Sequence, residues 1–265
     1  MRLFTPLRPA PRAFLAAANP AMKIAAAATL MLILFFCVDA VTAGVVLVGL
    51  LGAVALSGLS PRTLAGRTWP ILLTALSVGV LNVLLATPQG GSQVRIGPVD
   101  ASATALANGV GLGLRLAGIA FAGVLAMTTT DPTRLADSLV QQLRVSPRFA
   151  VGALAAARLI PVMALEWQIL SLARRARGVT GRGPIQAVRV FFGKLVALLI
   201  GAVRRATRLA TAMEARGFGA RDCRTNARHE EVRRADWLLL GGAMALGMLA
   251  VGISVLLGTW RFLFG

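Results

Sequence analysis

The residues of this chain best suited to a binding role form the same tripeptide twice. Ala176-Arg177-Gly178 and Ala215-Arg216-Gly217 each follow a long helical pattern. Glycine is the usual left-handed residue at a helix end, because it reaches a positive φ without the steric penalty of a Cβ atom. Each tripeptide therefore predicts a helix whose last turn presents one arginine. Two such ends in one chain indicate a paired device that docks on two similar partners.

The two tripeptides also have an ordinary structural explanation. Arginine near a helix C-terminus complements the helix dipole, and glycine is a common stop signal. In a chain rich in arginine and alanine, one such tripeptide would carry little weight. Two of them, each at the end of a long helix in one polar segment, favour docking, although local features alone leave both explanations open.

The composition of the chain is that of a membrane protein. Of its 265 residues, 57% are hydrophobic and only 14% are charged, whereas a soluble domain carries about 25% charged residues. The net charge of +18 raises the question of nucleic-acid binding. The chain has no tyrosine and no finger, homeodomain or RNP pattern, so we do not expect a nucleic-acid partner. Most basic residues fit the positive-inside rule instead.

The hydrophobic segments predict an all-α polytopic membrane protein embedded in the lipid bilayer, with about five transmembrane helices. The predicted spans are residues 24–38, 40–56, 70–86, 104–127 and 237–257. A polar return at 59–69 and a Gly/Pro-rich loop at 87–103 separate three of them. The fourth span is rich in glycine in its first half, which favours close helix packing.

Residues 128–236 differ from the rest of the chain. They hold 19 of the 28 Lys and Arg and 8 of the 10 Asp and Glu. The charge bias predicts that this segment and the N-terminus are cytoplasmic. We therefore expect three parts: a transmembrane domain of about four spans (1–127), a cytoplasmic coupling-helix bundle at the membrane face (128–236) and a last transmembrane helix (237–265).

Several helix starts are predicted from their capping residues. Asn19 and Ser146 each precede a proline, which fits the first turn of a helix. Either Thr130 or Asp131 caps the short helix that begins near Pro132.

A few polar residues stand out from their surroundings. Asp39 separates the first two spans, and we interpret it as a helix cap rather than an ion-binding group. Arg115 lies inside the fourth span, where an arginine is expensive unless it has a partner within the protein. Cys37 and Cys223 form no metal pattern and are expected to be free thiols. His229 is expected to be a solvated surface residue.

The chain lacks the motifs of a self-sufficient enzyme or pump. It has no phosphate-binding G-x-x-x-x-G-K-[ST] loop, no H-E-x-x-H, no paired Cys-x-x-Cys and no nucleophile elbow. Carboxylates are nearly absent from the predicted spans, so a proton relay has little to work with. These absences indicate a non-catalytic subunit with no metal site and no cofactor of its own.

The chain resembles the transmembrane T component of energy-coupling factor (ECF) vitamin and metal transporters, the EcfT/CbiQ-like permease group. The resemblance covers nearly the whole chain, and the paired Ala-Arg-Gly tripeptides are its specific part. The weaker matches are Asn19-Pro20-x-x-Lys23, where the family usually has Asp-Pro-x-x-Lys; Thr129 and Thr130 with Pro132; and Arg158-x-x-Pro161. Because Asn19 lacks the charge of the usual Asp, an ion pair made there by the family is not expected here.

The resemblance implies a coupling function in an ATP-driven importer. Family members join two cytosolic ATPases, identical or different, to a small membrane protein that binds the substrate, the S component. Their Ala-Arg-Gly helices dock in grooves of the ATPases, which bind ATP and Mg. Arg177 and Arg216 would then be anchors with fork-like bonds to carboxylates or carbonyls. Ala176 and Ala215 would leave room for close approach, and Gly178 and Gly217 would end the helices.

Other residues would support this assembly in the cell membrane. Glu214, Arg158 and Pro161 belong to the coupling region by their place in the matching motifs. Apolar residues recur at helical spacing between the two tripeptides and would contact the S component: Phe191, Phe192, Leu195 and Leu199. The transported vitamin or metal ion would be selected by that partner.

Two other classes of function compete with this interpretation. An autonomous secondary transporter would show inverted repeats and charged or broken helices at the membrane midplane, and apart from Arg115 the sequence shows little of either. A membrane-anchored basic protein would bind nucleic acid or anionic lipid through its total charge. The coupling hypothesis instead predicts that Arg177 and Arg216 matter far more than Arg174, Arg204 or Arg233.

Overall fold

The computed structural model describes residues 14–58, 61–85, 93–96, 99–179, 183–218 and 228–260. The chain divides into two compact units. The first comprises Met1–Ser138 and Glu230–Gly265, and the second comprises Leu139–His229. Cys223 lies outside the described residues, whereas Cys37 is a free, buried thiol as predicted.

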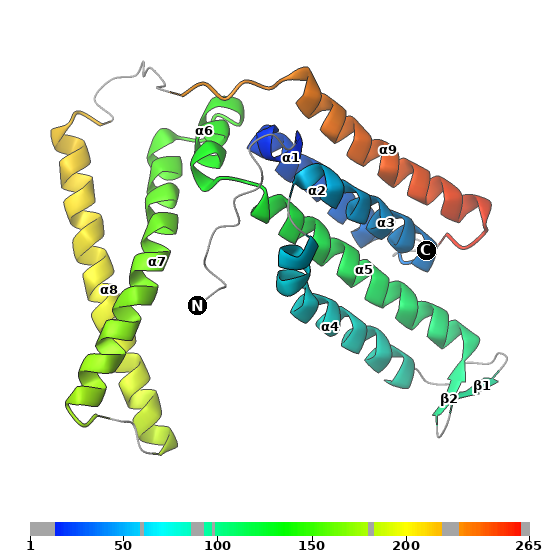
Figure 1. The fold of residues 1–265 in the computed structure, drawn as a ribbon, viewed down its shortest axis with the longest axis horizontal. Helices are drawn as coiled ribbons and strands as arrows, with labels where there is room; N and C mark the ends of the chain where they lie inside the picture. Colours follow the sequence, from blue (N-terminus) through cyan, green and yellow to red (C-terminus); the bar gives the residue numbers. More distant parts are fainter. Residues whose placement is uncertain are drawn as a thin grey trace. The chain divides into compact units, whose positions relative to one another are not determined.

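The first unit is built mainly from helices (Figure 1). The long ones are α2 (Pro20–Phe36), α3 (Ala40–Ser57), α4 (Pro61–Leu85), α5 (Ala103–Thr128) and α9 (Arg234–Leu256). The unit also includes the short α1 (Phe14–Ala17) and the start of α6 (Pro132–Gln142). Two short antiparallel strands, β1 (Gln93–Ile96) and β2 (Val99–Ser102), precede α5, with Gln93 opposite Ser102.

The core of this unit lies where α2, α3, α5 and α9 pack together. Leu34, Val46 and Ala250 come from three of these helices and are fully buried, and Phe121 of α5 packs with them. Since lipid is as apolar as these side chains, the helices are held by close packing and by hydrogen bonds between them. The polar contacts at their ends are therefore important for the arrangement.

The glycines of α5 allow close approach of neighbouring helices, as predicted. A Cβ atom on Gly79 of α4 would lie 2.8 Å from the carbonyl oxygen of Gly109, and one on Gly113 would lie 3.4 Å from the carbonyl oxygen of Ala75. On another side of α5, a Cβ on Gly118 would lie 2.9 Å from a methyl group of Leu34. Larger side chains would push α5 away from α4 and α2.

The predicted helix caps are confirmed. Asn19, Asp39, Asp131 and Ser146 each accept a hydrogen bond from a first-turn backbone N–H, at 3.0, 2.7, 2.8 and 3.4 Å respectively. Of the two candidates before α6, it is Asp131 whose side chain makes this bond.

The structure differs from the sequence predictions at two loops. The polar return predicted at 59–69 is helical from Pro61, because α4 begins there and continues through Pro70. The predicted span 70–86 agrees with the apolar part of α4, residues 68–85. Pro61 suits a helix start, whereas Pro70 lacks the N–H for a helical bond, and Figure 1 shows a bend in α4. The segment 87–103, predicted as a loop, contains the two strands.

Within the described ranges, five helices are long and apolar enough to cross a membrane by length and composition. They are residues 68–85 of α4, residues 105–128 of α5, and the whole of α7 (Pro147–Ala176), α8 (Pro184–Ala215) and α9. This confirms the prediction of an all-α polytopic membrane protein. The five are not the same five as predicted. The first two predicted spans, α2 and the apolar part of α3, are shorter than 18 residues, whereas α7 and α8, which were not predicted to span the membrane, are long and apolar enough to do so.

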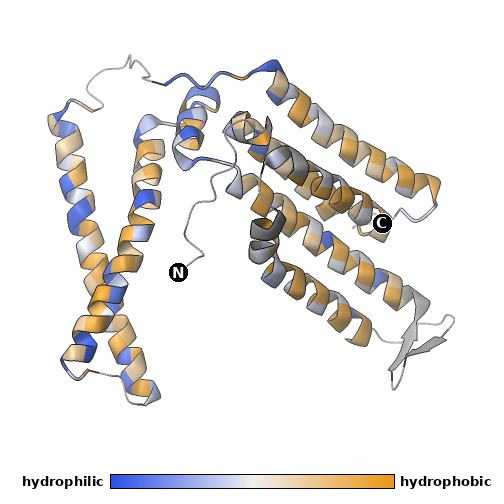
Figure 2. Cartoon of the chain, viewed as in Figure 1, coloured by the Kyte–Doolittle hydropathy of each residue, from blue (hydrophilic) through white to orange (hydrophobic). Residues whose placement is uncertain are grey.

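The second unit holds the end of α6 together with α7 and α8, and the two long helices cross like the arms of an X (Figure 1). Only Ala150 of α7 is buried, and no residue of α8 is. Hydrophobic residues make up much of both helices (Figure 2), and many of them are exposed. Such extensive exposed apolar surface needs a covering of lipid or of protein partners.

Candidate functional site

The first Ala-Arg-Gly tripeptide ends α7 in a Schellman motif. Arg177 is the C-cap residue, and Gly178 follows it in the left-handed region at φ 75°. The backbone N–H of Gly178 donates to the carbonyl of Arg175 (3.0 Å), and that of Val179 donates to the carbonyl of Arg174 (2.9 Å). These two bonds satisfy carbonyls that a helix end would otherwise leave without donors.

The second tripeptide ends α8 in the same way. Arg216 is the C-cap residue, and Gly217 has φ 73°. Gly217 donates its N–H to the carbonyl of Glu214 (2.9 Å), and Phe218 donates to that of Met213 (3.0 Å). The two helix ends thus share one hydrogen-bond pattern, which the sequence repeat predicted.

The three residues of each tripeptide are exposed. A Cβ atom on either terminating glycine would meet no other residue within 4 Å. Among the residues that the structure describes, Arg177 and Arg216 have no hydrogen-bond or ion-pair partner for their side chains. Each guanidinium therefore keeps its donors available for another molecule.

The two helix ends lie at opposite ends of the crossed pair (Figure 1). Helix α8 starts close to where α7 stops and runs for 32 residues. At about 1.5 Å per residue, its length is about 48 Å. One compact groove cannot accept both arginines, so the geometry suits two separate binding sites.

Of the other predicted site residues, only Glu214 lies beside one of the two helix ends. Arg158 and Pro161 are exposed in the middle of α7, so the structure does not bring them to either tripeptide. Glu214 contributes its carbonyl to the second Schellman motif, and its side chain is exposed. The apolar set Phe191, Phe192, Leu195 and Leu199 is exposed on α8, with Leu199 at 62%.

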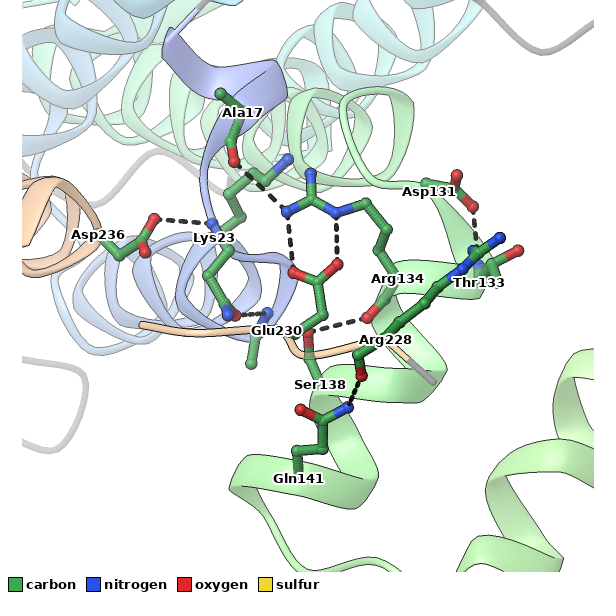
Figure 3. A network of polar contacts seen from close by, with 12 residues as sticks. Ala17, Lys23, Asp131, Thr133, Arg134, Ser138, Gln141, Arg228, Glu230 and Asp236 are labelled. Carbon is green, nitrogen blue, oxygen red and sulfur yellow. Dashed lines mark hydrogen bonds and ion pairs between the residues drawn. The ribbon is translucent and has the colours of Figure 1, made fainter. Parts of the chain in front are cut away.

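A second polar cluster lies in the first unit, where α2, α5 and α9 end or begin (Figure 3). Lys23 is only 4% exposed and donates from Nζ to the carbonyl of Thr129 at the end of α5 (2.8 Å). Asp236, at the start of α9, accepts from the backbone N–H of Asn19 (2.7 Å) and of Arg233 (2.7 Å). The motif Asn19-Pro20-x-x-Lys23 therefore joins three helix ends, while the role of Asp236 had no local signal in the sequence.

An ion pair extends this cluster towards α6. Arg134 binds both carboxylate oxygens of Glu230, from Nε (2.7 Å) and from Nη2 (2.9 Å). Its hydrogen bond to Glu230 is the main reason why the pKa of Arg134 is raised above its ordinary value. Arg134 also donates to the carbonyl of Ala17 (3.4 Å) at the end of α1.

Polar contacts also lie at the opposite ends of α2 and α9, where they join α2 to α5 and α9 to the start of α3. Arg115 donates from Nη2 to the carbonyl of Phe35 and lies over its ring, which gives this arginine the internal partner that its position required. Asp39, besides capping α3, accepts from the hydroxyl of Ser254 in α9 (2.7 Å). Within the described ranges, no three His, Cys, Asp or Glu side chains come together as a metal site.

Comparison with known proteins gives a consistent result. The family model CbiQ, described as cobalt transport protein, matches residues 11–226. The energy-coupling factor transporter transmembrane protein EcfT of Thermosediminibacter oceani is 30% identical over 243 residues, which cover 88% of this chain and 90% of that protein. The protein of the same name from Streptococcus equi subsp. equi is 28% identical, with coverage of 92% and 90%. That of Lacticaseibacillus paracasei is 37% identical over 53% of this chain and 57% of its own length.

Proposed function

The chain belongs to the cobalt transport protein family, and we propose that it is the transmembrane coupling component of an ATP-driven ECF-type importer. In this function it links two cytosolic ATPases to a small membrane protein that binds the substrate. ATP and Mg²⁺ are bound by the ATPases, and the vitamin or metal ion is selected by the substrate-binding protein. This chain itself carries no catalytic residue.

The observation that carries the proposal is the pair of equivalent helix ends. Arg177 and Arg216 are presented by the same backbone conformation and are exposed. Two similar ATPases would offer two similar grooves, and each would receive one helix end. A planar guanidinium suits this role, because it binds a carboxylate or a pair of carbonyls with fixed geometry.

The charges on α7 and α8 support a place at the cytoplasmic face rather than across the bilayer. Although both helices are long and apolar enough to span a membrane, α8 alone carries Arg189, Lys194, Arg204, Arg205, Arg208 and Glu214. Charged groups at bilayer depth are expensive. A helix pair at the interface keeps them in water or against the ATPases, and the basic excess of 128–236 supports a cytoplasmic position for this face.

The apolar side of α8 supports a protein partner within the membrane interface. Phe191, Phe192, Leu195 and Leu199 are all at least 45% exposed. Covering them removes apolar surface from water, which favours association. We assign this face to the substrate-binding membrane protein.

Co-purification tests this function. A tagged wild-type chain, expressed with its native ATPases and extracted in mild detergent, is compared with the double variant Arg177→Glu/Arg216→Glu. We expect the ATPases to co-purify with the wild type and their recovery to drop by at least about tenfold in the variant, since each replacement reverses an interfacial charge. Arg148→Glu/Arg204→Glu is the matched control, because it makes the same charge change on the same two helices, at exposed positions away from both tripeptides.

Two outcomes would contradict the proposal. One is full recovery of the ATPases with the double variant. The other is a wild-type chain that purifies alone and still transports in vesicles, which would favour a secondary transporter.

The same experiment bears on the substrate. A small membrane protein that co-purifies with the wild type would point to the transported compound, because that protein binds it.

A further inference from the structure

An ion pair joins α7 and α8 across their crossing. The guanidinium of Arg205 binds both carboxylate oxygens of Glu166, through Nη1 to Oε1 and through Nη2 to Oε2 (2.6 Å). A two-pronged pair fixes the relative orientation of the two side chains as well as their separation. This contact therefore adds a restraint on orientation that an apolar contact lacks.

A second group of contacts lies nearer to the end of α7. Arg174 of α7 donates from Nη1 to the backbone carbonyl of Val190 in α8 (3.0 Å). Lys194 of α8 donates to the hydroxyl of Ser171 (3.2 Å), and its Nζ lies 4.2 Å from the ring centroid of Trp167. Hydrogen bonds and a cation–π contact thus join the helices at a second level.

Two glycines of α8 make room for the arginines. A Cβ atom on Gly193 would lie 2.9 Å from Nη1 of Arg174, and one on Gly201 would lie 3.2 Å from Nη2 of Arg205. Glycine weakens the interior of a helix relative to alanine. A guanidinium lies against α8 at both Gly193 and Gly201, and the space that it needs explains why glycine is found there.

The outermost of these contacts are well separated along each helix, and the contacts of Lys194 lie between them. Glu166 and Arg174 lie eight residues apart in α7, or about 12 Å along its axis. Val190 and Arg205 lie fifteen residues apart in α8, or about 22 Å. One contact point would let the helices turn about it, whereas two separated points fix an angle.

We propose that these contacts, the crossing clamp, hold α7 and α8 at a fixed angle and thereby set the separation of Arg177 and Arg216. The crossing clamp consists of Glu166 with Arg205, of Arg174 with the carbonyl of Val190 and of Lys194 with Ser171 and Trp167, together with Gly193 and Gly201, which leave room for the arginines. This inference rests on the proposed function. When one ATPase moves the helix end bound to it, the clamp transmits that movement to the other helix. Its residues are positioning residues and bind neither ATPase.

The separation of the helix ends is measured directly with spin labels. Cysteines replace Leu172 and Ala212, which are exposed one turn before each end, in a full-length chain whose native Cys37 and Cys223 are replaced by alanine. Electron–electron distance measurements are made on the chain alone and on its complex with the ATPases. The chain alone tests the clamp even if no ATPase binds, so failure of the clamp and failure of the proposed function are distinguishable.

The test variants have matched controls on the same helices. Arg205→Ala is paired with Arg204→Ala. Gly193→Leu is paired with Gly152→Leu, because a side chain at Gly152 would meet nothing within 4 Å. We expect the test variants to broaden the distance distribution and both controls to leave it narrow. The charge exchange Glu166→Arg/Arg205→Glu should restore a narrow distribution, which a merely misfolded chain would not.

Transport provides the second measurement. ATPase recovery should be unchanged in Arg205→Ala, because both helix ends are intact. Uptake per ATP hydrolysed should fall by about fivefold, within the range by which substitutions along a coupling network change coupling. An unchanged distance distribution in both Arg205→Ala and Gly193→Leu, or unchanged uptake per ATP despite a broadened distribution, would overturn the proposal.

Discussion

Arg177 and Arg216 occupy equivalent positions in two helix ends of the same geometry. Each precedes a glycine with a left-handed backbone, at φ 75° and 73°. In each case the N–H two residues after the arginine bonds to the carbonyl five residues earlier, at 2.9 and 3.0 Å. The backbone therefore presents both arginines in the same way, at opposite ends of the crossed helices (Figure 1).

The terminating glycines are expected to be necessary for this presentation. Gly178→Ala and Gly217→Ala each place a Cβ in the left-handed region, at a cost of about 1–2 kcal/mol, so the helix end unwinds or shifts. We expect the apparent affinity for the ATPases, measured by titration of the purified chain, to weaken by about tenfold per end. Gly152→Ala, in the interior of α7, is the control and should leave the affinity unchanged; an equal loss in this variant would refute the explanation.

Lys23 is expected to contribute more to stability than an exposed basic residue does. Lys23→Met removes a charged hydrogen bond and leaves the carbonyl of Thr129 buried without its donor. We expect a loss of about 2 kcal/mol and a fall in the thermal unfolding midpoint in detergent of about 4–8 °C. Arg148→Met, at an exposed position of α7, should change the midpoint little. Equal midpoints for the two variants would show that the buried bond is unimportant.

Asp236 and Glu230 belong to the same polar cluster but should differ in their effect on stability. Asp236→Asn replaces one of two acceptor oxygens that bind backbone N–H groups, at a cost of about 1–3 kcal/mol. Glu230→Gln weakens an ion pair whose arginine side chain is 32% exposed, and pairs of this kind contribute less than about 1 kcal/mol. We therefore expect Asp236→Asn to lower the thermal unfolding midpoint more than Glu230→Gln, when both are measured in the same detergent. A larger fall in the midpoint of Glu230→Gln would contradict this prediction.

Much of the local structure followed from residue types. Glycine after arginine predicted both Schellman ends, and proline after Asn19 and Ser146 predicted two helix starts. These features depend on a few neighbouring residues and on backbone sterics. The start of α4 was missed because Pro70 was taken as a boundary, although a proline within a long helix is tolerated with a bend.

Contacts between distant segments could not be predicted in the same way. The pairing of Arg205 with Glu166 and of Asp236 with the backbone of Asn19 depends on how helices pack, and no local pattern specifies it. Arg115 shows the limit clearly. The sequence predicted that Arg115 has a partner within the protein. It could not predict which one, because the partner is the backbone carbonyl of Phe35 and every residue has such a carbonyl.

The number of ATPases bound per chain tests the central claim most directly. Native mass spectrometry of the detergent-solubilised complex would count ATPase subunits on the wild type, on Arg177→Glu, on Arg216→Glu and on the double variant. We predict two subunits, one, one and none, because each helix end holds one ATPase. Two subunits retained on the double variant, or both lost together from complexes in which only Arg204 is changed, would contradict the assignment of these two arginines.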